Sequence, residues 1–148
     1  MLSEEEIDDL LQSRTLYING EIRWKQKSNQ QYFEFRLKVS GCDHDIELVC
    51  TKNPLLEKGY SFALLLEGKR IRGFDPDGRH LNRFPKREQI VGIHKHKWTD
   101  DYEDSNAYVP NDIPSTEISA AFYAFLNECN IRFDGTFVPP PVFQPGLF

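Results

Sequence analysis

The feature that most constrains the fold is a two-residue alternation of apolar and charged side chains between Tyr32 and Ser40. Successive side chains of a β-strand point to opposite faces, so this segment has one apolar face and one charged face. Such a strand fits a sheet that buries one face and exposes the other to water. The apolar positions are Phe33, Phe35, Leu37 and Val39, and the charged positions are Glu34, Arg36 and Lys38.

Related patterns predict further strands, and the turn residues between them favour an antiparallel meander. Gly41 marks one such turn, and Asn53 with Pro54 marks another. We expect about five to seven strands in one sheet, which is a usual size. The additional strands are predicted over residues 15–25, 45–51, 60–67, 69–74 and 90–98.

Two helices are expected beside this sheet. Ser3 and Glu6 have the spacing of a capping box, and the apolar residues that follow predict a short helix over residues 4–12. A second helix is predicted to begin at Pro114 or Ser115 and to end near residues 129–130. The sequence therefore predicts an α+β fold in which the sheet packs against the C-terminal helix, with the short N-terminal helix at one edge.

The length and composition predict one globular domain, because the chain has 148 residues, 39% of them hydrophobic and 28% charged. We assign residues 1–133 to a single α+β domain. Residues 134–148 contain Pro139, Pro140 and Pro141 among apolar side chains, so we expect an extended, proline-rich apolar tail. This tail and the acidic N-terminal helix are two candidate docking elements for a protein partner.

Several classes of protein find no support in the sequence. It contains no Walker loop, GxSxG elbow, HExxH helix or Rossmann glycine pattern. No apolar run approaches the roughly 20 residues of a membrane span, and the acidic start does not resemble a secretory signal. Three cysteines without a CxxC pair argue against a disulfide framework and a zinc ribbon. We expect a cytoplasmic protein with no membrane partner and leave its oligomeric state open.

The net charge of −5 hides a basic segment. Residues 69–97 contain nine Lys and Arg but three Asp and Glu, whereas the flanking segments are acidic. A basic segment on an acidic protein can form a focused anion site. The alternative interpretation is that these charges alternate on solvated strand faces.

Three of the four histidines also lie in this segment, at His80, His94 and His96. Residues two apart on a strand point to one face, so His94 and His96 can converge on a single ligand. Asp75 and Asp77 belong to a predicted Asp-Pro-Asp-Gly turn, which can also direct a carboxylate towards the histidines. Histidine changes charge near neutral pH and is the commonest metal ligand, so this cluster is the predicted site.

The function we expect first is a metal-independent endoribonuclease of toxin type, with RNA as its partner. His80, His94 and His96 would share the acid and base roles, because RNA cleavage requires both. Asp75 or Asp77 would orient a histidine. The phosphate would be bound by Arg79, Arg83 and Lys97.

Two other functions remain open on the same residues. In a zinc-dependent hydrolase, His80, His94 and His96 would bind zinc and leave its fourth position open. In a non-catalytic interaction module, such as an antitoxin, inhibitor or defence accessory, the acidic flanks or the apolar tail would bind another protein. The cofactor prediction is therefore none, with zinc as the alternative.

Four short motifs follow one another within residues 64–132: a glycine turn containing Asp75, then His80-Leu81-Asn82, His94-Lys95-His96 and Cys129-Asn130-Ile131. In this order they resemble a family of small, uncharacterised bacterial proteins. The family continues His-x-Asn with Pro-Asp-Gly, whereas this chain continues with Arg83-Phe84-Pro85. The resemblance implies where the site lies. Small proteins of this kind often accompany mobile elements or toxin–antitoxin-like loci, so it also implies nucleic-acid chemistry.

Overall fold

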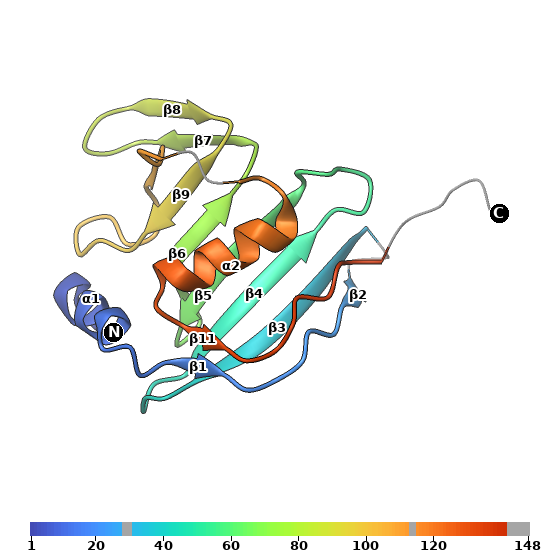
Figure 1. Ribbon diagram of the computed structural model, residues 1–148. Coiled ribbons are helices and arrows are strands. Elements are labelled where there is room, and N and C mark those ends of the chain that lie inside the picture. The colour runs from blue at the N-terminus through green and yellow to red at the C-terminus, as the bar shows by residue number, and fades with distance from the viewer. Residues whose placement is uncertain (28–30, 113–114, 142–148) are drawn as a thin grey trace.

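A computed structural model describes residues 1–27, 31–112 and 115–141 (Figure 1). The structure confirms the α+β class, with helices α1 (Glu4–Gln12) and α2 (Ile118–Glu128) beside a mostly antiparallel sheet. The strands are β1 (Tyr17–Ile18), β2 (Lys25–Lys27), β3 (Tyr32–Ser40), β4 (Ile46–Lys52), β5 (Tyr60–Leu66), β6 (Lys69–Asp75), β7 (Arg79–Asn82), β8 (Glu88–Val91), β9 (His94–Lys97), β10 (Ala107–Tyr108) and β11 (Arg132–Phe133).

The main sheet is larger than the five to seven strands expected. Within the described residues it has nine strands, in the order β10-β9-β6-β5-β4-β3-β1-β11, with β2 also paired to β3. Strands β7 and β8 form a separate two-stranded hairpin. The three extra strands are β2, β10 and β11, whose two or three residues are too short to show an alternation in the sequence. The strand predicted over residues 15–25 is present as β1, which is only two residues long.

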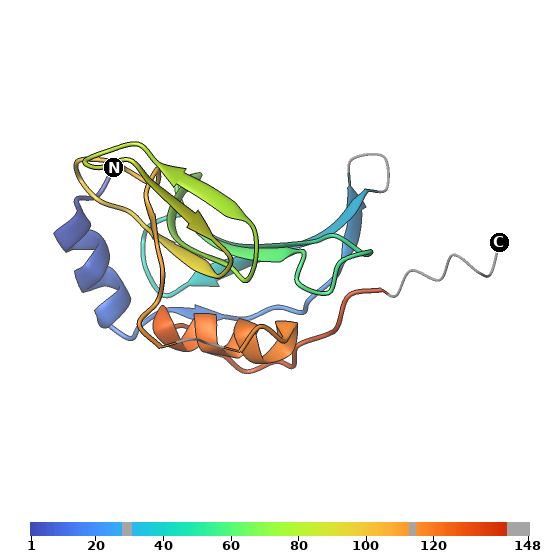
Figure 2. The ribbon, with the colours of Figure 1, turned by 90° about the horizontal axis from the view of Figure 1, so that it is seen from above.

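Helix α2 covers one face of the sheet, and the hairpin β7–β8 lies on the opposite face (Figure 2). The fully buried ring of Phe122 packs against Phe35 of β3 and Phe62 of β5, at centroid distances of 6.0 and 5.9 Å. Phe125 stacks on Phe62 at 5.7 Å. Burial of these large rings supplies much of the hydrophobic stabilisation of the sheet–helix interface.

Different features define the two ends of α2, a side-chain cap at its N-terminus and a positive φ after its C-terminus. The helix starts later than predicted because the Glu117 carboxylate caps it, accepting hydrogen bonds from Ser119 N at 3.0 Å and Ala120 N at 2.8 Å. These bonds lower the pKa of Glu117. The predicted start at Pro114 lies outside the described residues. At the other end Asn130 adopts a positive φ of 55°, which the αL position after a helix favours.

Helix α1 has the predicted bounds and the predicted capping box between Ser3 and Glu6. Its apolar side turns inward, where Ile7 and Leu11 are buried in the core. Asp8 connects the helix to the sheet, because its carboxylate lies 2.7 Å from Arg72 Nη2. The apolar face of α1 is therefore occupied by its own chain.

The described start of the predicted tail also packs against the chain itself. Phe137 is buried against Phe122, with a centroid distance of 5.0 Å, and its N–H donates to the Tyr123 hydroxyl at 2.9 Å. Trp24 Nε1 donates to the Val138 carbonyl at 2.8 Å. The remainder of the tail, residues 142–148, lies outside the described residues. Neither helix in the described ranges has the length and apolar character that a membrane crossing requires.

Candidate active site

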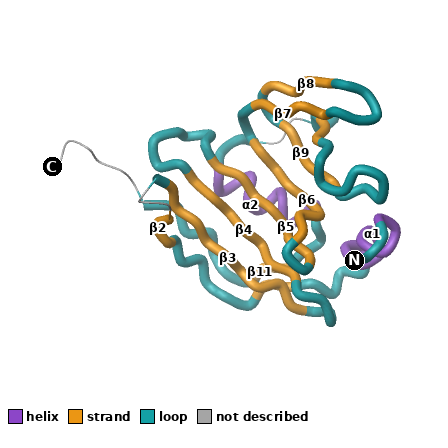
Figure 3. Tube along the Cα trace, turned by 180° about the vertical axis from the view of Figure 1, so that it is seen from behind, coloured by secondary structure: helices purple, strands orange, loops and turns teal. Residues whose placement is uncertain are grey.

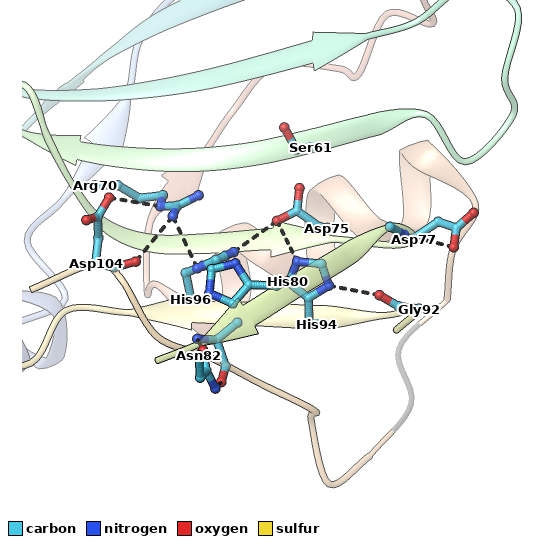
Figure 4. Close-up of polar contacts among 12 residues, drawn as sticks. Ser61, Arg70, Asp75, Asp77, His80, Asn82, Gly92, His94, His96 and Asp104 are labelled. Carbon is cyan, nitrogen blue, oxygen red and sulfur yellow. Dashed lines mark hydrogen bonds and ion pairs between the residues drawn. The ribbon is translucent and has the colours of Figure 1, made fainter. Parts of the chain in front are cut away.

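The pairing of β6 with β9 brings one carboxylate and two imidazoles together (Figure 4). Asp75 lies opposite His94 in the register, and Gly73 lies opposite His96. Because strand residues two apart share a face, all three functional side chains point to the same side. The Asp75 Oδ2 atom lies 3.3 Å from His94 Nε2 and 3.2 Å from His96 Nε2.

Gly73 makes room for this cluster. A Cβ atom at this position would lie 3.3 Å from His96 Cβ and 3.2 Å from Arg70 Cδ, which is closer than an ordinary contact. The φ of this residue is not in the left-handed region, so the requirement is one of space. A glycine here allows the imidazole and the guanidinium to lie beside each other over β6.

The hairpin β7–β8 covers the cluster and contributes the third histidine. The His80 ring lies 4.9 Å from the His96 ring and 5.9 Å from the His94 ring, measured between centroids. Two residues along the strand, Asn82 fixes the hairpin to β10. Its Nδ2 donates to the Ala107 carbonyl at 2.7 Å, and its Oδ1 accepts from Ala107 N at 2.8 Å.

This cover leaves the members of the cluster with different access to solvent. His94 and His96 are 4% and 3% exposed, whereas the Asp75 side chain is 24% exposed. His80 is half-buried. A substrate would therefore meet Asp75 and His80 before it met the two histidines of β9.

The hydrogen-bond partners assign a tautomer to His96. Its Nδ1 lies 3.2 Å from Arg70 Nη2, and a guanidinium can only donate, so Nδ1 must accept. In a neutral ring the proton then sits on Nε2, which lies 3.2 Å from Asp75 Oδ2, within ion-pair range. Both contacts are compatible with a neutral imidazole at His96.

His94 has the opposite arrangement. Its Nδ1 lies 2.8 Å from the Gly92 carbonyl, which can only accept, so Nδ1 carries a proton. Its Nε2 faces the Asp75 carboxylate, another acceptor, and this contact is attractive when Nε2 carries a proton as well. Both ring nitrogens of His94 therefore face acceptors, with the Asp75 carboxylate at Nε2.

His80 provides a free ring nitrogen. Its Nε2 lies 2.8 Å from the Ser105 carbonyl and therefore donates its proton there. The Nδ1 atom of the neutral ring is then unprotonated, and it makes no hydrogen bond to any residue in the described part of the chain. His80 and His94 thus differ in what their ring nitrogens face: both nitrogens of His94 face acceptors, whereas only Nε2 of His80 does among the described residues.

Arg70 is the member of the site that the sequence pattern missed. The β5–β6 register shifts between Leu64 and Leu65, so that Ile71 is an extra residue between Arg70 and Arg72. Such a bulge changes the alternation and puts Arg70 on the face of Gly73 and Asp75.

The Arg70 guanidinium is held by a loop beyond β9. Its Nη2 donates to the Asp104 carbonyl at 3.3 Å. Its Nε lies 3.5 Å from the Asp104 carboxylate, within ion-pair range, but makes no hydrogen bond to a described residue. Arg70 is therefore positioned by Asp104 from one side and directed at His96 Nδ1 on the other.

Other predicted site residues lie away from the cluster. Asp77 accepts a hydrogen bond from Gly78 N at 2.9 Å in its own exposed turn. Lys97 points to the opposite face of β9, where its Nζ lies 3.8 Å from Asp8. Arg79 and Arg83 are exposed on the hairpin. The structure thus groups Asp75, His80, His94 and His96 but separates them from all three predicted phosphate-binding residues.

Asp75, His94 and His96 also form a candidate metal site, since one ligand atom from each lies within 4.8 Å of the others. His94 fits this role because its Nδ1 donates to a carbonyl, as metal-binding histidines usually do. His96 fits poorly, because the Arg70 guanidinium occupies its Nδ1 and adds a positive charge beside the site. His80, a ligand in the three-histidine alternative, is outside this group.

A separate cavity of about 470 Å³ lies on the α2 side of the sheet. Lys95, whose side chain points away from the two neighbouring histidines, reaches this cavity, and its Nζ lies 3.0 Å from Glu128 Oε2.

Comparisons with protein-family models, curated proteins and solved structures find no match for this chain. The function is therefore inferred from the side-chain geometry.

Proposed function

We propose that this protein is a metal-independent endoribonuclease with the histidine–aspartate cluster as its active site. The observation that carries the proposal is the different surroundings of two histidines in one cluster. His80 Nδ1 has no hydrogen-bond partner among the described residues, and His94 Nε2 lies 3.3 Å from the Asp75 carboxylate. RNA cleavage needs a base for the 2′-hydroxyl and an acid for the leaving 5′-oxygen.

His80 Nδ1 is the general base in this mechanism. It removes the proton from the 2′-hydroxyl, whose oxygen then attacks the adjacent phosphorus. The hydrogen bond from Nε2 to the Ser105 carbonyl fixes the tautomer and stabilises the imidazolium that forms. The products of this attack are a 2′,3′-cyclic phosphate and a free 5′-hydroxyl.

The His94–Asp75 pair supplies the proton for the leaving oxygen. Because His94 is nearly buried, Asp75 is the member of the pair that reaches the substrate. In this step a protonated His94 transfers its Nε2 proton to the Asp75 carboxylate, which then gives that proton to the 5′-oxygen and is a carboxylate again. Arg70 acts as a positioning residue, since its contact with Nδ1 of His96 directs the Nε2 of that ring at the same carboxylate.

The test is a cleavage assay on single-stranded and structured RNA in the presence of EDTA. Wild-type protein is expected to cleave and to leave cyclic phosphate ends. His80→Ala and His94→Ala are each expected to lose about 100-fold or more in rate. His44→Ala is the matched control, because His44 lies on the surface beside Glu67 and should retain full activity. Cleavage that persists in His80→Ala, or no cleavage under any condition, would contradict the proposal.

The converging ligand atoms of Asp75, His94 and His96 favour a zinc-dependent hydrolase as the second candidate. Elemental analysis of purified wild-type protein beside a His94→Ala/His96→Ala variant separates the two functions. Stoichiometric zinc that disappears in the variant, together with hydrolysis abolished by EDTA, would replace the ribonuclease proposal. Metal-free protein with EDTA-resistant cleavage would eliminate the zinc enzyme.

A further inference from the structure

The outer surface of the hairpin β7–β8 is strongly basic. Residues 79–91 contain four Lys and Arg residues and one acidic residue, Glu88, and all five side chains are exposed. Several basic residues on the main sheet are paired instead, as Arg36 is with Glu47 at 2.7 Å. No carboxylate in the described ranges pairs with the hairpin cations, which are Arg79, Arg83, Lys86 and Arg87.

An exposed aromatic ring lies among these cations. Phe84 is 65% exposed, and its backbone is held in place because Asn106 Nδ2 donates to its carbonyl at 2.7 Å. A single exposed apolar side chain needs no functional explanation. An aromatic ring flanked by unpaired cations is different, because it is the arrangement that proteins use to stack nucleobases beside their phosphates.

The same hairpin reaches the active site with its inner side. His80 belongs to the hairpin and contacts Ser105, and the next residue, Asn106, holds Phe84. Phe84 lies four positions after His80 and just beyond the end of β7, so their Cα atoms are at most about 13 Å apart. One chain of nucleotides can therefore contact Phe84 and His80 together. Figure 3 shows the hairpin at one end of the molecule, on the far side of β6 from β2 and β3.

We propose that the hairpin β7–β8 is an RNA-capture element for unpaired nucleotides. Phe84 stacks on a base, and the four hairpin cations bind the phosphates on either side of the cleaved bond. The substrate is single-stranded RNA, because a base must leave a duplex to stack on a protein ring. This inference rests on the proposed ribonuclease activity for its choice of ligand.

The size of the electrostatic contribution follows from counterion release. Each phosphate neutralised by a cation changes the slope of log K against log salt by about 0.7 for a single strand. Removing three such contacts should make the slope shallower by about 2. At a salt concentration of about 0.1 M the same loss corresponds to roughly 100-fold weaker binding.

The experiment measures binding of a fluorescent single-stranded RNA to the full chain, over a range of salt concentrations. All proteins carry His80→Ala so that the RNA remains intact. The test variant adds Arg83→Glu, Lys86→Glu and Arg87→Glu. The control adds the same number of charge reversals at exposed lysines outside the hairpin, namely Lys25→Glu, Lys38→Glu and Lys58→Glu.

The hairpin variant is expected to bind roughly 100-fold more weakly with the shallower slope, and the control should bind like the parent. Phe84→Ala should weaken binding roughly tenfold without changing the slope, since stacking releases no counterions. A duplex of the same sequence should bind more weakly than the single strand. Equal effects of the two triple variants, or no RNA binding by the parent, would overturn the inference.

Wild-type cleavage distinguishes this inference from the proposed activity. Hairpin-dependent binding without any cleavage would contradict the ribonuclease and support RNA capture. Cleavage that the hairpin substitutions leave unchanged would support the ribonuclease and overturn RNA capture.

Discussion

Asn82→Ala should release the hairpin β7–β8 from the main sheet. Asn82 is 6% exposed and makes two short hydrogen bonds to the backbone of Ala107, one in each direction. Alanine would leave a buried N–H and a buried C=O without partners, and each such group costs about 1–3 kcal/mol. Water entering the vacated space offsets part of this cost, so we expect a loss of about 2–4 kcal/mol in the free energy of unfolding.

Urea denaturation at neutral pH measures this loss. Asn106→Ala is the control, because Asn106 makes a single exposed bond to Phe84 and should cost less than about 1 kcal/mol. RNA cleavage should fall in Asn82→Ala as well, since His80 is positioned by the same hairpin. A destabilisation no larger than that of the control would refute the reasoning, because Asn82 would then not anchor the hairpin.

Two further predictions concern other parts of the fold. Burial raises the pKa of Cys129 to about 12 from an ordinary value of 9.0, so between these pH values the folded thiol keeps a proton that the unfolded thiol loses. The free energy of unfolding should therefore fall by up to about 1.4 kcal/mol per pH unit above pH 9. When thermal unfolding is measured over this pH range, the melting temperature should decrease less steeply with pH in Cys129→Ala than in a Cys42→Ala control. Gly73→Ala pushes a Cβ against His96 and Arg70 and should lower the cleavage rate roughly tenfold, whereas Gly20→Ala, where that Cβ would lie at an ordinary 3.8 Å from Leu37 Cδ2, should retain the rate. Full activity in Gly73→Ala would show that the close approach over β6 does not matter for catalysis.

The parts of the fold that the sequence predicted correctly are those with a strong local pattern. Strand β3 has the bounds of the alternating segment Tyr32–Ser40, and α1 begins after its capping box. The predicted strand over residues 90–98 was wrong in its extent, because Gly92 adopts a φ of 96° and divides it into β8 and β9. An isolated glycine in a strand pattern indicates that the strand can break there, but it does not predict the direction of the chain after the break.

The composition of the site could be predicted only in part. The two-residue spacing places His94 and His96 on one face of β9, as the structure has them. Arg70 could not be found in this way, because its direction depends on a bulge created by pairing with β5. Lys97 lies on the opposite face of β9 from both histidines, as the two-residue period itself requires, and there its Nζ lies 3.8 Å from Asp8 of α1. Long-range pairing thus decided the place of Arg70, and local periodicity carries no information about such pairing.

The parallel pairing of β1 with β11 has a consequence for the order of folding. Tyr17 pairs with Arg132, 115 positions further along the chain, whereas on its other side β1 pairs with the nearby β3. Closing so long a loop costs about 4 kcal/mol of chain entropy before any contact is gained. We therefore expect the β1–β11 edge to form last, after the meander from β3 to β6 has collapsed on α2. During synthesis, β1 would pair with β3 first, and its other edge would stay unpaired until Phe133 at the end of β11 had left the ribosome.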